Sequence, residues 1–475
     1  MKKLLFIPLL AGCAFAQQAA TVTIDAGKVI HKVDPKEFHG INLVALWNGG
    51  DNVIDDTSLQ MYKQMGMGIL RFPGGVPCQW YDWKTPLASG WTTLTPENVA
   101  AFAKKGGSRM MFQTNTANDA TTEKDGRKYS FNSSGTHAAE WVLAMKKAGV
   151  DVAWWEIGNE PEMDAPDPHK HSQEAIYEWY NAKYKEQVTA IKKADPRAKV
   201  MGPSATNTWF WWAQGNLAKF LKAHGNKTGS GMVDAISLHW YLERTEQNWE
   251  TKKGAVQAEW PRAMDFIQKT IAEHDSRKLP LFITEWNWGA GDKNESGSLF
   301  ANAMGVADAI GMFMRTGVAG HNYFCYKKIN RNWGVVATTG DNRPNNEGSP
   351  SYYALALTSL LHGDVLETTN TADEANVLSA YATRGADRMN SVLLINKTGE
   401  PMEVKLDWQG PSRPMGASVQ MHTLEGESPV ARDVTLNGVK SPEPWKSALP
   451  PPKTIQLRQP TITLAPYSVN VLRVR

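Results

Sequence analysis

Eight short apolar runs that alternate with helix-like stretches constrain the fold of this chain more than any other feature. The runs lie at residues 38–43, 68–72, 109–113, 153–158, 199–202, 235–240, 281–284 and 320–325. The stretches between them carry apolar residues at helical spacing and include 136–148, 172–194, 260–273 and 298–315. Strands that alternate with helices form a parallel sheet, so the sequence predicts an α/β fold.

A closed barrel and an open, doubly wound sheet both show this alternation. The open sheet normally carries a glycine-rich phosphate-binding loop after its first strand. Gly40 and the Gly49-Gly50 pair do not have the spacing of that loop. We therefore expect a (β/α)8 TIM barrel over residues 37–361, with the ends of all eight strands meeting at one face.

The pattern changes after an amphipathic helix that we expect at residues 352–361. Short alternating strands follow at 377–382, 391–396, 403–406, 461–464 and 468–474. They predict an antiparallel β-sandwich over residues 362–475, which either braces the barrel or binds carbohydrate. Residues 21–25 and 28–30 alternate in the same way and predict a hairpin, so residues 21–36 are expected to join the sandwich.

The N-terminus has the features of a targeting signal. Lys2-Lys3 precedes an apolar stretch at 4–11 that is too short to span a bilayer. Ala14-Phe15-Ala16 fits a cleavage site that would remove residues 1–16, whereas Leu10-Ala11-Gly12-Cys13 resembles a lipoprotein signal that would lipidate Cys13. Both alternatives predict a bacterial protein outside the cytoplasm, either secreted, periplasmic or at the outer cell surface.

Charge and cysteine content exclude some classes of function. The formal net charge is +3, which gives no reason to expect nucleic acid as a partner. Beyond the predicted signal only Cys78 and Cys325 remain, and we expect both to be buried thiols outside any disulfide. The chain also has 19 tryptophans, whose flat faces can stack on sugar rings or fill cores.

Two strands end on a glutamate. Glu160 follows the apolar run at 153–158, and Glu285 follows the run at 281–284. In a closed barrel both strand ends lie at the same face, so one site would hold two carboxyl groups. Two carboxyl groups are the minimum equipment for breaking a glycosidic bond.

These motifs resemble clan A of the glycoside hydrolases, which are retaining TIM-barrel glycosidases. Asn159-Glu160-Pro161 matches the clan's fourth-strand motif, and Thr284-Glu285-Trp286 matches its seventh-strand motif. The chain is most similar to the α-L-arabinofuranosidase and β-xylosidase-like families. The further matching segments are Leu70-Arg71-Phe72-Pro73-Gly74-Gly75, Tyr81-Asp82-Trp83, Glu156-Ile157-Gly158-Asn159-Glu160, Gly202-Pro203-Ser204 and Ser237-Leu238-His239-Trp240-Tyr241.

The resemblance implies a role for each glutamate. Glu285 would be the nucleophile, and Glu160 would be the general acid and then the base. Retention of configuration requires carboxyl groups about 5–5.5 Å apart. We expect ionised Glu285 to raise the pKa of Glu160 by like-charge repulsion and so keep it protonated.

Other residues are expected to bind substrate or orient the glutamates. The resemblance implies that Arg71 pairs with Glu285 and that Asn159 binds the sugar 2-hydroxyl. His239 and Tyr241 alternate with apolar residues and should face the barrel interior. Asn115, Trp286 and Tyr326 complete the predicted substrate-binding set, with Trp333 as an alternative to Tyr326 at the eighth strand.

Three further groups have open interpretations. Glu156 is expected to be a buried carboxylate, paired and not catalytic. Trp47, Trp80, Trp209, Trp211 and Trp212 are either sugar platforms or packed loop residues. His169 and His171 could suggest a metal, but their spacing fits a solvated loop better, so we expect neither a metal nor a cofactor.

The sequence as a whole predicts a retaining glycoside hydrolase that acts on cell-wall polysaccharide or oligosaccharide. The first alternative is α-L-arabinofuranosidase-like release of single sugars. The second is endo-action on a β-glucan or β-xylan, because tryptophan-rich loops could line a long cleft. A non-catalytic carbohydrate-binding protein is a remote alternative, since it would be expected to lack one of the two glutamates.

Overall fold

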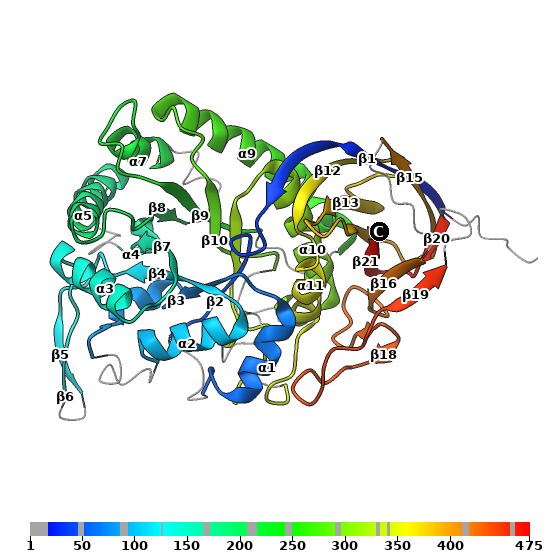
Figure 1. Ribbon diagram of the computed structural model, residues 1–475, viewed down its shortest axis with the longest axis horizontal. Coiled ribbons are helices and arrows are strands. Elements are labelled where there is room, and N and C mark those ends of the chain that lie inside the picture. The colour runs from blue at the N-terminus through cyan, green and yellow to red at the C-terminus, as the bar shows by residue number, and fades with distance from the viewer. Residues whose placement is uncertain are drawn as a thin grey trace, which may run out of the picture.

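The computed structural model describes residues 18–45, 52–85, 94–124, 127–164, 172–206, 216–242, 249–289, 296–328, 333–339, 343–410, 418–456 and 461–475. Its larger part is a closed parallel barrel, as predicted (Figure 1). The barrel strands are β2 (His39–Asn42), β3 (Ile69–Phe72), β4 (Arg109–Thr114), β7 (Val152–Ile157), β8 (Val200–Ala205), β9 (Ala235–Tyr241), β10 (Leu281–Asn287) and β11 (Gly320–Tyr323). All eight correspond to predicted runs.

Helices cover the outside of the barrel. They are α1 (Asp56–Met65), α2 (Pro96–Gly106), α3 (Gly135–Lys147), α5 (Gln173–Ala194), α7 (Leu217–His224), α9 (Ala255–His274) and α10 (Phe300–Thr316). Several begin at a capping side chain, since Thr95, Ser134 and Ser172 each accept a bond from a backbone N–H three residues later. A two-stranded hairpin, β5 (Thr121–Lys124) and β6 (Arg127–Ser130), follows β4 and was not predicted.

One layer of apolar side chains fills the lower part of the barrel interior. It contains Ile69, Met111, Ala153, Trp154, Met201, Ala235 and Phe282. Because side chains alternate along a strand, residues two positions further along point into the same interior nearer the C-terminal face. Gln113 therefore lies above Met111 in the barrel interior, Glu156 above Trp154, and Arg71 above Ile69. Polar residues at these positions point into the top of the barrel.

Strand β10 breaks this alternation. Its register against both β9 and β11 shifts after Ile283. Strict alternation from Phe282 would turn Trp286 inward, but the shift turns Glu285 into the barrel and Trp286 outward. An irregularity of this kind re-aims side chains and is common beside functional sites.

The C-terminal part forms a second, mostly antiparallel sheet. Its strands are β12 (Gly363–Asn370), β13 (Leu378–Arg384), β14 (Asn390–Asn396), β15 (Met402–Gln409), β16 (Ser418–Glu425), β17 (Thr435–Leu436), β18 (Val439–Lys440), β19 (Lys453–Gln456), β20 (Thr461–Leu464) and β21 (Ser468–Val474). Residues of β13, β14 and β21 share one apolar core with residues of β15 and β20, so the sheet packs on itself as a sandwich. Strands β12 and β16 to β19 were not predicted.

The N-terminal segment joins this sandwich as one strand. The predicted hairpin is wrong, because β1 (Gln18–Val33) runs without a turn. It pairs antiparallel with β12 and parallel with β15, and its register to β12 shifts between Asp25 and Val29. That irregularity spans Ala26-Gly27-Lys28 and includes the two residues between the predicted hairpin strands, Ala26 and Gly27.

Two buried helices separate the barrel from the sandwich. Every residue of α11 (Pro350–Thr358) is buried, so the expected amphipathic helix has no solvent-facing side. In α10 all residues from Phe300 to Met314 are buried. Strand β14 is also buried on both faces, since Val392 and Leu394 lie in the sandwich core while Leu393 and Ile395 pack into the core shared with α10.

A buried ion pair joins the two parts. Lys397 Nζ lies 2.7 Å from Asp308 Oδ2, and both side chains are almost fully buried. Asp308 belongs to α10 and also accepts bonds from Gln257 and Tyr381. Lys397 Nζ also donates to the carbonyl oxygens of Glu374 and Ala375.

The described residues include both cysteines beyond the predicted signal. Cys78 and Cys325 are both buried, and neither belongs to a disulfide. Among the described helices, none has the length and apolar character needed to cross a membrane. The predicted signal, including Cys13, lies outside the described residues.

The Lys397–Asp308 pair predicts a large effect of one substitution. Lys397→Met should lower the free energy of unfolding by about 3–5 kcal/mol, because Asp308 stays buried without its cation. Lys440→Met removes an exposed lysine from a looser pair with Glu427 and should change stability by less than about 0.5 kcal/mol. Chemical denaturation measures the free energy of unfolding of both variants. Equal losses of stability in the two variants would contradict the prediction.

Candidate active site

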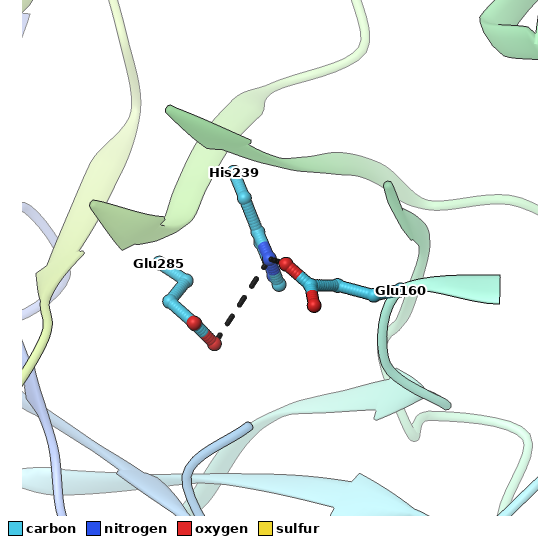
Figure 2. Close-up of side chains that lie close together, drawn as sticks. All are labelled: Glu160, His239 and Glu285. Atoms are coloured by element: carbon cyan, nitrogen blue, oxygen red, sulfur yellow. Dashed lines mark hydrogen bonds and ion pairs between the residues drawn. The ribbon is translucent and has the colours of Figure 1, made fainter. Parts of the chain in front are cut away.

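Two glutamates from distant parts of the sequence meet at the C-terminal end of the barrel. Glu160 follows β7, and Glu285 lies in β10. Their side chains are 16% and 9% exposed. One carboxylate oxygen of each lies within 4.8 Å of the other and of a ring nitrogen of His239. Figure 2 shows the imidazole facing both carboxylates.

Arg71, in β3, binds two carboxylates inside the barrel. Its Nε donates to Glu156 Oε2 at 2.6 Å, and its Nη1 donates to Glu285 Oε2 at 3.1 Å. Burial by itself lowers the pKa of Arg71, but the two carboxylates outweigh burial and the pKa rises. The structure therefore pairs Arg71 with Glu285, as the resemblance implied, and also with Glu156.

The same guanidinium reaches four neutral acceptors. They are Asn42 Oδ1 at 2.7 Å, Asn159 Oδ1 at 3.2 Å, Ser204 Oγ at 3.4 Å and His239 Nε2 at 3.4 Å. Through these contacts one side chain connects β2, β7, β8, β9 and β10. Asn42 extends the network by donating to backbone carbonyls of Thr284, Asn322 and Tyr323.

The partners of His239 fix its protonation state. Burial lowers the pKa of His239 to about 4, so the ring is neutral near pH 7. Arg71 has only donors, so its contact requires Nε2 to be the acceptor nitrogen. The proton is then on Nδ1, which lies 2.8 Å from Glu160 Oε1 and donates to it. Ser204 Oγ, 3.0 Å from Nε2, donates to the same lone pair.

Glu160 has a raised pKa, but for a different reason from the predicted one. Burial raises the pKa of Glu160 to about 7, and the positive charge of Arg71 offsets part of that rise. The predicted cause, repulsion from Glu285, is therefore wrong. Because His239 donates to Oε1, the proton of neutral Glu160 belongs on Oε2, the oxygen that faces away from the imidazole.

Tyr241 is the second donor to Glu285. Its hydroxyl lies 2.6 Å from Glu285 Oε1. Burial, reinforced by the charge of Glu285, raises the pKa of Tyr241 well above its usual range, so the phenol stays protonated and donates. Glu285 is thus held by Arg71 on one oxygen and by Tyr241 on the other.

The backbone around the two glutamates has unusual conformations. Glu160 has a φ of 36° and Ser204 a φ of 54°, both in the left-handed region, and Glu160 N donates to Ser204 O at 2.9 Å. Backbone strain of this kind is characteristic of functional sites. Gly75 has a φ of 89°, and a Cβ there would lie 3.0 Å from Glu285 Oε2. A side chain at this position would crowd the carboxylate, and the positive φ also favours glycine.

Gln113 is a site residue that the sequence reasoning missed. Its Oε1 accepts from the backbone N–H groups of Gly74 and Gly75 at 3.1 and 2.8 Å, so its Nε2 is the donor to Asn159 Oδ1 at 3.2 Å. Arg71 donates to the same oxygen. These donors fix the amide orientation of Asn159, with Oδ1 toward Arg71. Gln113 could have been found from the sequence, because it lies two residues after Met111 in the same strand and therefore points to the same side of the sheet.

Glu162 is a second missed residue. It accepts from the Tyr177 hydroxyl and from Thr206 N, the latter at 3.3 Å. Burial raises its pKa to about 7. The side chain joins the turn after Glu160 to the end of β8 and so stabilises the position of Glu160.

Three residues predicted to bind substrate lie elsewhere. Trp286 packs outside the barrel, and its Nε1 donates to His321 Nδ1 at 3.2 Å. Tyr326 is fully buried, and its hydroxyl donates to Ser58 O at 2.6 Å. Asn115 closes its own loop, accepting from Ala117 N and Asn118 N and donating to Asn118 O.

The structure supports Trp333 over Tyr326 as the aromatic residue near the site. The Trp333 ring meets Tyr241 edge to face with centroids 5.5 Å apart, and Phe324 at 5.4 Å. Lys328 Nζ lies 5.0 Å from the same ring. Trp47, Trp209, Trp211, Trp212, His169 and His171 lie outside the described residues.

The Glu160, His239 and Glu285 cluster has the spacing of a metal site. Arg71 argues against that use, since its fixed positive charge lies 3.1 Å from Glu285 Oε2. The Nδ1 proton of His239 also points at Glu160, where a metal would need a lone pair. The chemistry of this donor set suits proton transfer and nucleophilic attack better than metal binding.

A barrel that presents two close glutamates at the C-terminal ends of its fourth and seventh strands is the architecture of a clan A glycoside hydrolase. The sequence model of the family described as "Glycosyl hydrolases family 39" matches residues 141–389, which are just over half of the chain. The chain belongs to that family. A comparison with curated protein sequences found no match.

Solved structures of other glycoside hydrolases have a similar fold. A family 51 α-L-arabinofuranosidase from Bifidobacterium longum has a TM-score of 0.70 at 14% identity, over 96% of this chain and 99% of its own. An α-L-arabinofuranosidase from Thermotoga maritima has a TM-score of 0.71 at 15% identity, over 96% and 99%. A family 44 xyloglucanase from Paenibacillus polymyxa has a TM-score of 0.65 at 13% identity, over 96% and 99%. At these identities the similarity shows the fold alone.

The raised pKa of Glu160 predicts a pH-dependent cost to stability. Between pH 4.5 and about 7 the folded protein holds a proton that the unfolded chain releases, so this contribution to stability falls as the pH rises. Glu160→Gln cannot titrate and keeps the acceptor for His239. Relative to the native protein, it should gain about 2–3 kcal/mol between pH 4.5 and 8.

Chemical denaturation at several pH values measures this difference. Glu403→Gln, which changes an exposed glutamate of β15, is the control and should follow the native pH dependence. A Glu160→Gln curve parallel to the native curve would contradict the raised pKa.

Proposed function

We propose that this family 39 protein is a retaining glycosidase in which Glu285 is the nucleophile and Glu160 is the acid and base. The separation of the two carboxylates carries the proposal. Retaining enzymes hold them about 5–5.5 Å apart, whereas inverting enzymes need about 6.5–9.5 Å to admit a water molecule. The distance of less than 4.8 Å between their oxygens supports the retaining arrangement.

In the first step an oxygen of Glu285 attacks the anomeric carbon while the bond to the leaving oxygen breaks. Glu160, neutral because burial raises its pKa, gives its Oε2 proton to that oxygen. His239 holds the other oxygen of Glu160 and so directs the proton away from itself. The product of this step is an ester between Glu285 and the sugar.

In the second step water replaces Glu285. The water attacks the anomeric carbon while Glu160, now a carboxylate, takes a proton from that water. The bond between Glu285 and the sugar breaks, and Glu285 leaves as a carboxylate. The hydroxyl of Tyr241 and the guanidinium of Arg71 then receive the returning charge. Two inversions give net retention.

For the substrate we propose an α-L-arabinofuranosidase-like action on cell-wall polysaccharide or oligosaccharide. The strand-end motifs and the fold shared with α-L-arabinofuranosidases support this choice. The alternative is endo-action on a β-glucan or β-xylan, which the fold shared with a xyloglucanase supports. The N-terminal sequence supports export, either by release or by lipidation of Cys13, to where such polymers occur.

A product profile distinguishes the two actions. The protein would be incubated with arabinan, arabinoxylan, xylan, xyloglucan and a soluble cellulose derivative, and the released sugars separated by size. A single monosaccharide would support exo-action and identify the sugar. A ladder of oligosaccharides would support endo-action, and no release from any polymer would contradict both proposals.

Chemical rescue tests the two assigned roles. With azide and an aryl glycoside, Glu160→Ala should form a glycosyl azide of retained configuration, because azide attacks the anomeric carbon of the ester and Glu285 leaves as a carboxylate. Glu285→Ala should form the inverted azide, because azide then takes the place of the nucleophile. Proton NMR of the products reads the configuration. Unchanged turnover in both variants without azide would refute the assignment.

The pKa of Glu160 also predicts the alkaline limb of the activity profile. Since the first step needs protonated Glu160, kcat/KM should fall tenfold per pH unit above about pH 7. An aryl glycoside with a good leaving group needs less proton donation and should show a shallower fall. If kcat/KM stays constant up to pH 9, both for a substrate with a poor leaving group and for the aryl glycoside, the role of Glu160 is contradicted.

A further inference from the structure

Glu156 is a fully buried carboxylate that the proposed reaction does not use. It lies in β7, four residues before Glu160, and its side chain is deeper in the barrel. Its Oε2 accepts a hydrogen bond from Arg71 Nε at 2.6 Å. Among the described residues its other oxygen, Oε1, has no hydrogen-bond partner. A buried ionic group is costly unless it is paired, and an oxygen without a hydrogen bond adds to that cost.

Hydrogen bonding alone does not explain a carboxylate at this position. A glutamine of the same shape could also accept a hydrogen bond from Arg71 Nε, although a weaker one. The other nitrogens of the guanidinium already have neutral acceptors in Asn42, Asn159 and Ser204. What Glu156 adds to the contact is a negative charge.

That charge acts on Glu285 through Arg71. With Glu156 present, one guanidinium is shared by two carboxylates and the three groups together carry one negative charge. Without Glu156, Arg71 and Glu285 would form a neutral pair, and the Glu285 carboxylate would be more strongly stabilised. A more stabilised carboxylate is a weaker nucleophile.

The same charge matters when Glu285 becomes an ester. Glu285 then loses its charge, and Arg71 would remain as an uncompensated cation inside the barrel. Glu156 still pairs with it at 2.6 Å. The loss of charge on Glu285 therefore costs less.

We propose that Glu156 is a positioning residue that tunes the nucleophile, by neutralising Arg71 so that Glu285 stays reactive and can give up its charge. This inference rests on the proposed retaining mechanism. Glu156 touches neither the substrate nor the reacting atoms, and it acts only through the guanidinium.

The test compares Glu156→Gln, which removes the charge and keeps the shape, with Glu156→Asp, which keeps the charge. Both would be assayed for kcat/KM against pH with the aryl glycoside of the sugar that the product profile identifies. Asp308→Asn, which changes a buried ion pair away from the site, controls for lost stability. Glu285→Gln would be assayed beside them.

The acid limb of the profile reports protonation of the nucleophile. The charged and titratable groups facing Glu285 are Arg71 from β3, His239 and Tyr241 from β9, Glu160 after β7 and Cys325 after β11. All of them are unchanged in the two Glu156 variants. A shift of the limb therefore measures the charge at residue 156 and the position of Arg71.

Glu156→Gln should move the acid limb to lower pH by about one unit and lower kcat/KM by roughly ten- to a hundredfold. Glu156→Asp and Asp308→Asn should leave the limb where it is. If Glu156 only held Arg71 in place, its loss would loosen the Arg71–Glu285 contact, and the limb would stay or move to higher pH in both Glu156 variants. That result would overturn the inference.

The two proposals fail differently. If Glu285→Gln keeps native turnover, the retaining mechanism itself is refuted. If Glu285→Gln is inactive while the acid limb of Glu156→Gln does not move down, only the role of Glu156 is refuted. Should Glu156→Gln not fold, a limb displaced in Glu156→Asp would by itself overturn the inference.

Discussion

The pairing of Arg71 with two carboxylates is the interaction on which the site depends. A guanidinium inside a barrel cannot lose its proton, so its charge has to be matched by anions at hydrogen-bond distance. Glu156 and Glu285 supply them at 2.6 and 3.1 Å. The neutral acceptors around Arg71 come from β2, from the turn after β7, and from β8 and β9. One side chain thereby fixes the relative positions of residues that lie far apart in the sequence.

Different partners give the two proposed catalytic carboxyl groups different roles. Glu285 accepts hydrogen bonds from a guanidinium cation and from a phenol hydroxyl. Glu160 receives one bond from a neutral imidazole and is removed from water, so its pKa rises to about 7. Two glutamates of the same chemistry thus become an anion and an acid because their surroundings differ.

The sandwich contributes to the barrel through shared packing. Strand β14 is buried on both faces because one face closes the sandwich core and the other covers α10. Helices α10 and α11 are buried on all sides for the same reason, and the Lys397–Asp308 pair lies in this layer. The sandwich therefore covers an apolar surface that the barrel would otherwise expose to water.

Much of the fold could be predicted from the sequence. Periodicity is a local property, so the eight barrel strands and the glutamates at their ends could be recognised in the chain itself. Strands β16 to β19 were missed because they are short or lack clear alternation. The predicted hairpin is wrong because Ala26-Gly27 can form either a turn or part of an irregular strand, and only pairing with β12 decides between them.

The tertiary structure decided what the site residues contact. Strict alternation could not show that a register shift in β10 turns Glu285 inward and Trp286 outward, because that shift depends on the neighbouring strands. Sequence likewise named Glu156 and Arg71 without showing that they meet. The motifs determined which chemical groups this protein carries, and closure of the barrel determined their distances, burial and charge. Those properties arise from residues brought together across the whole chain.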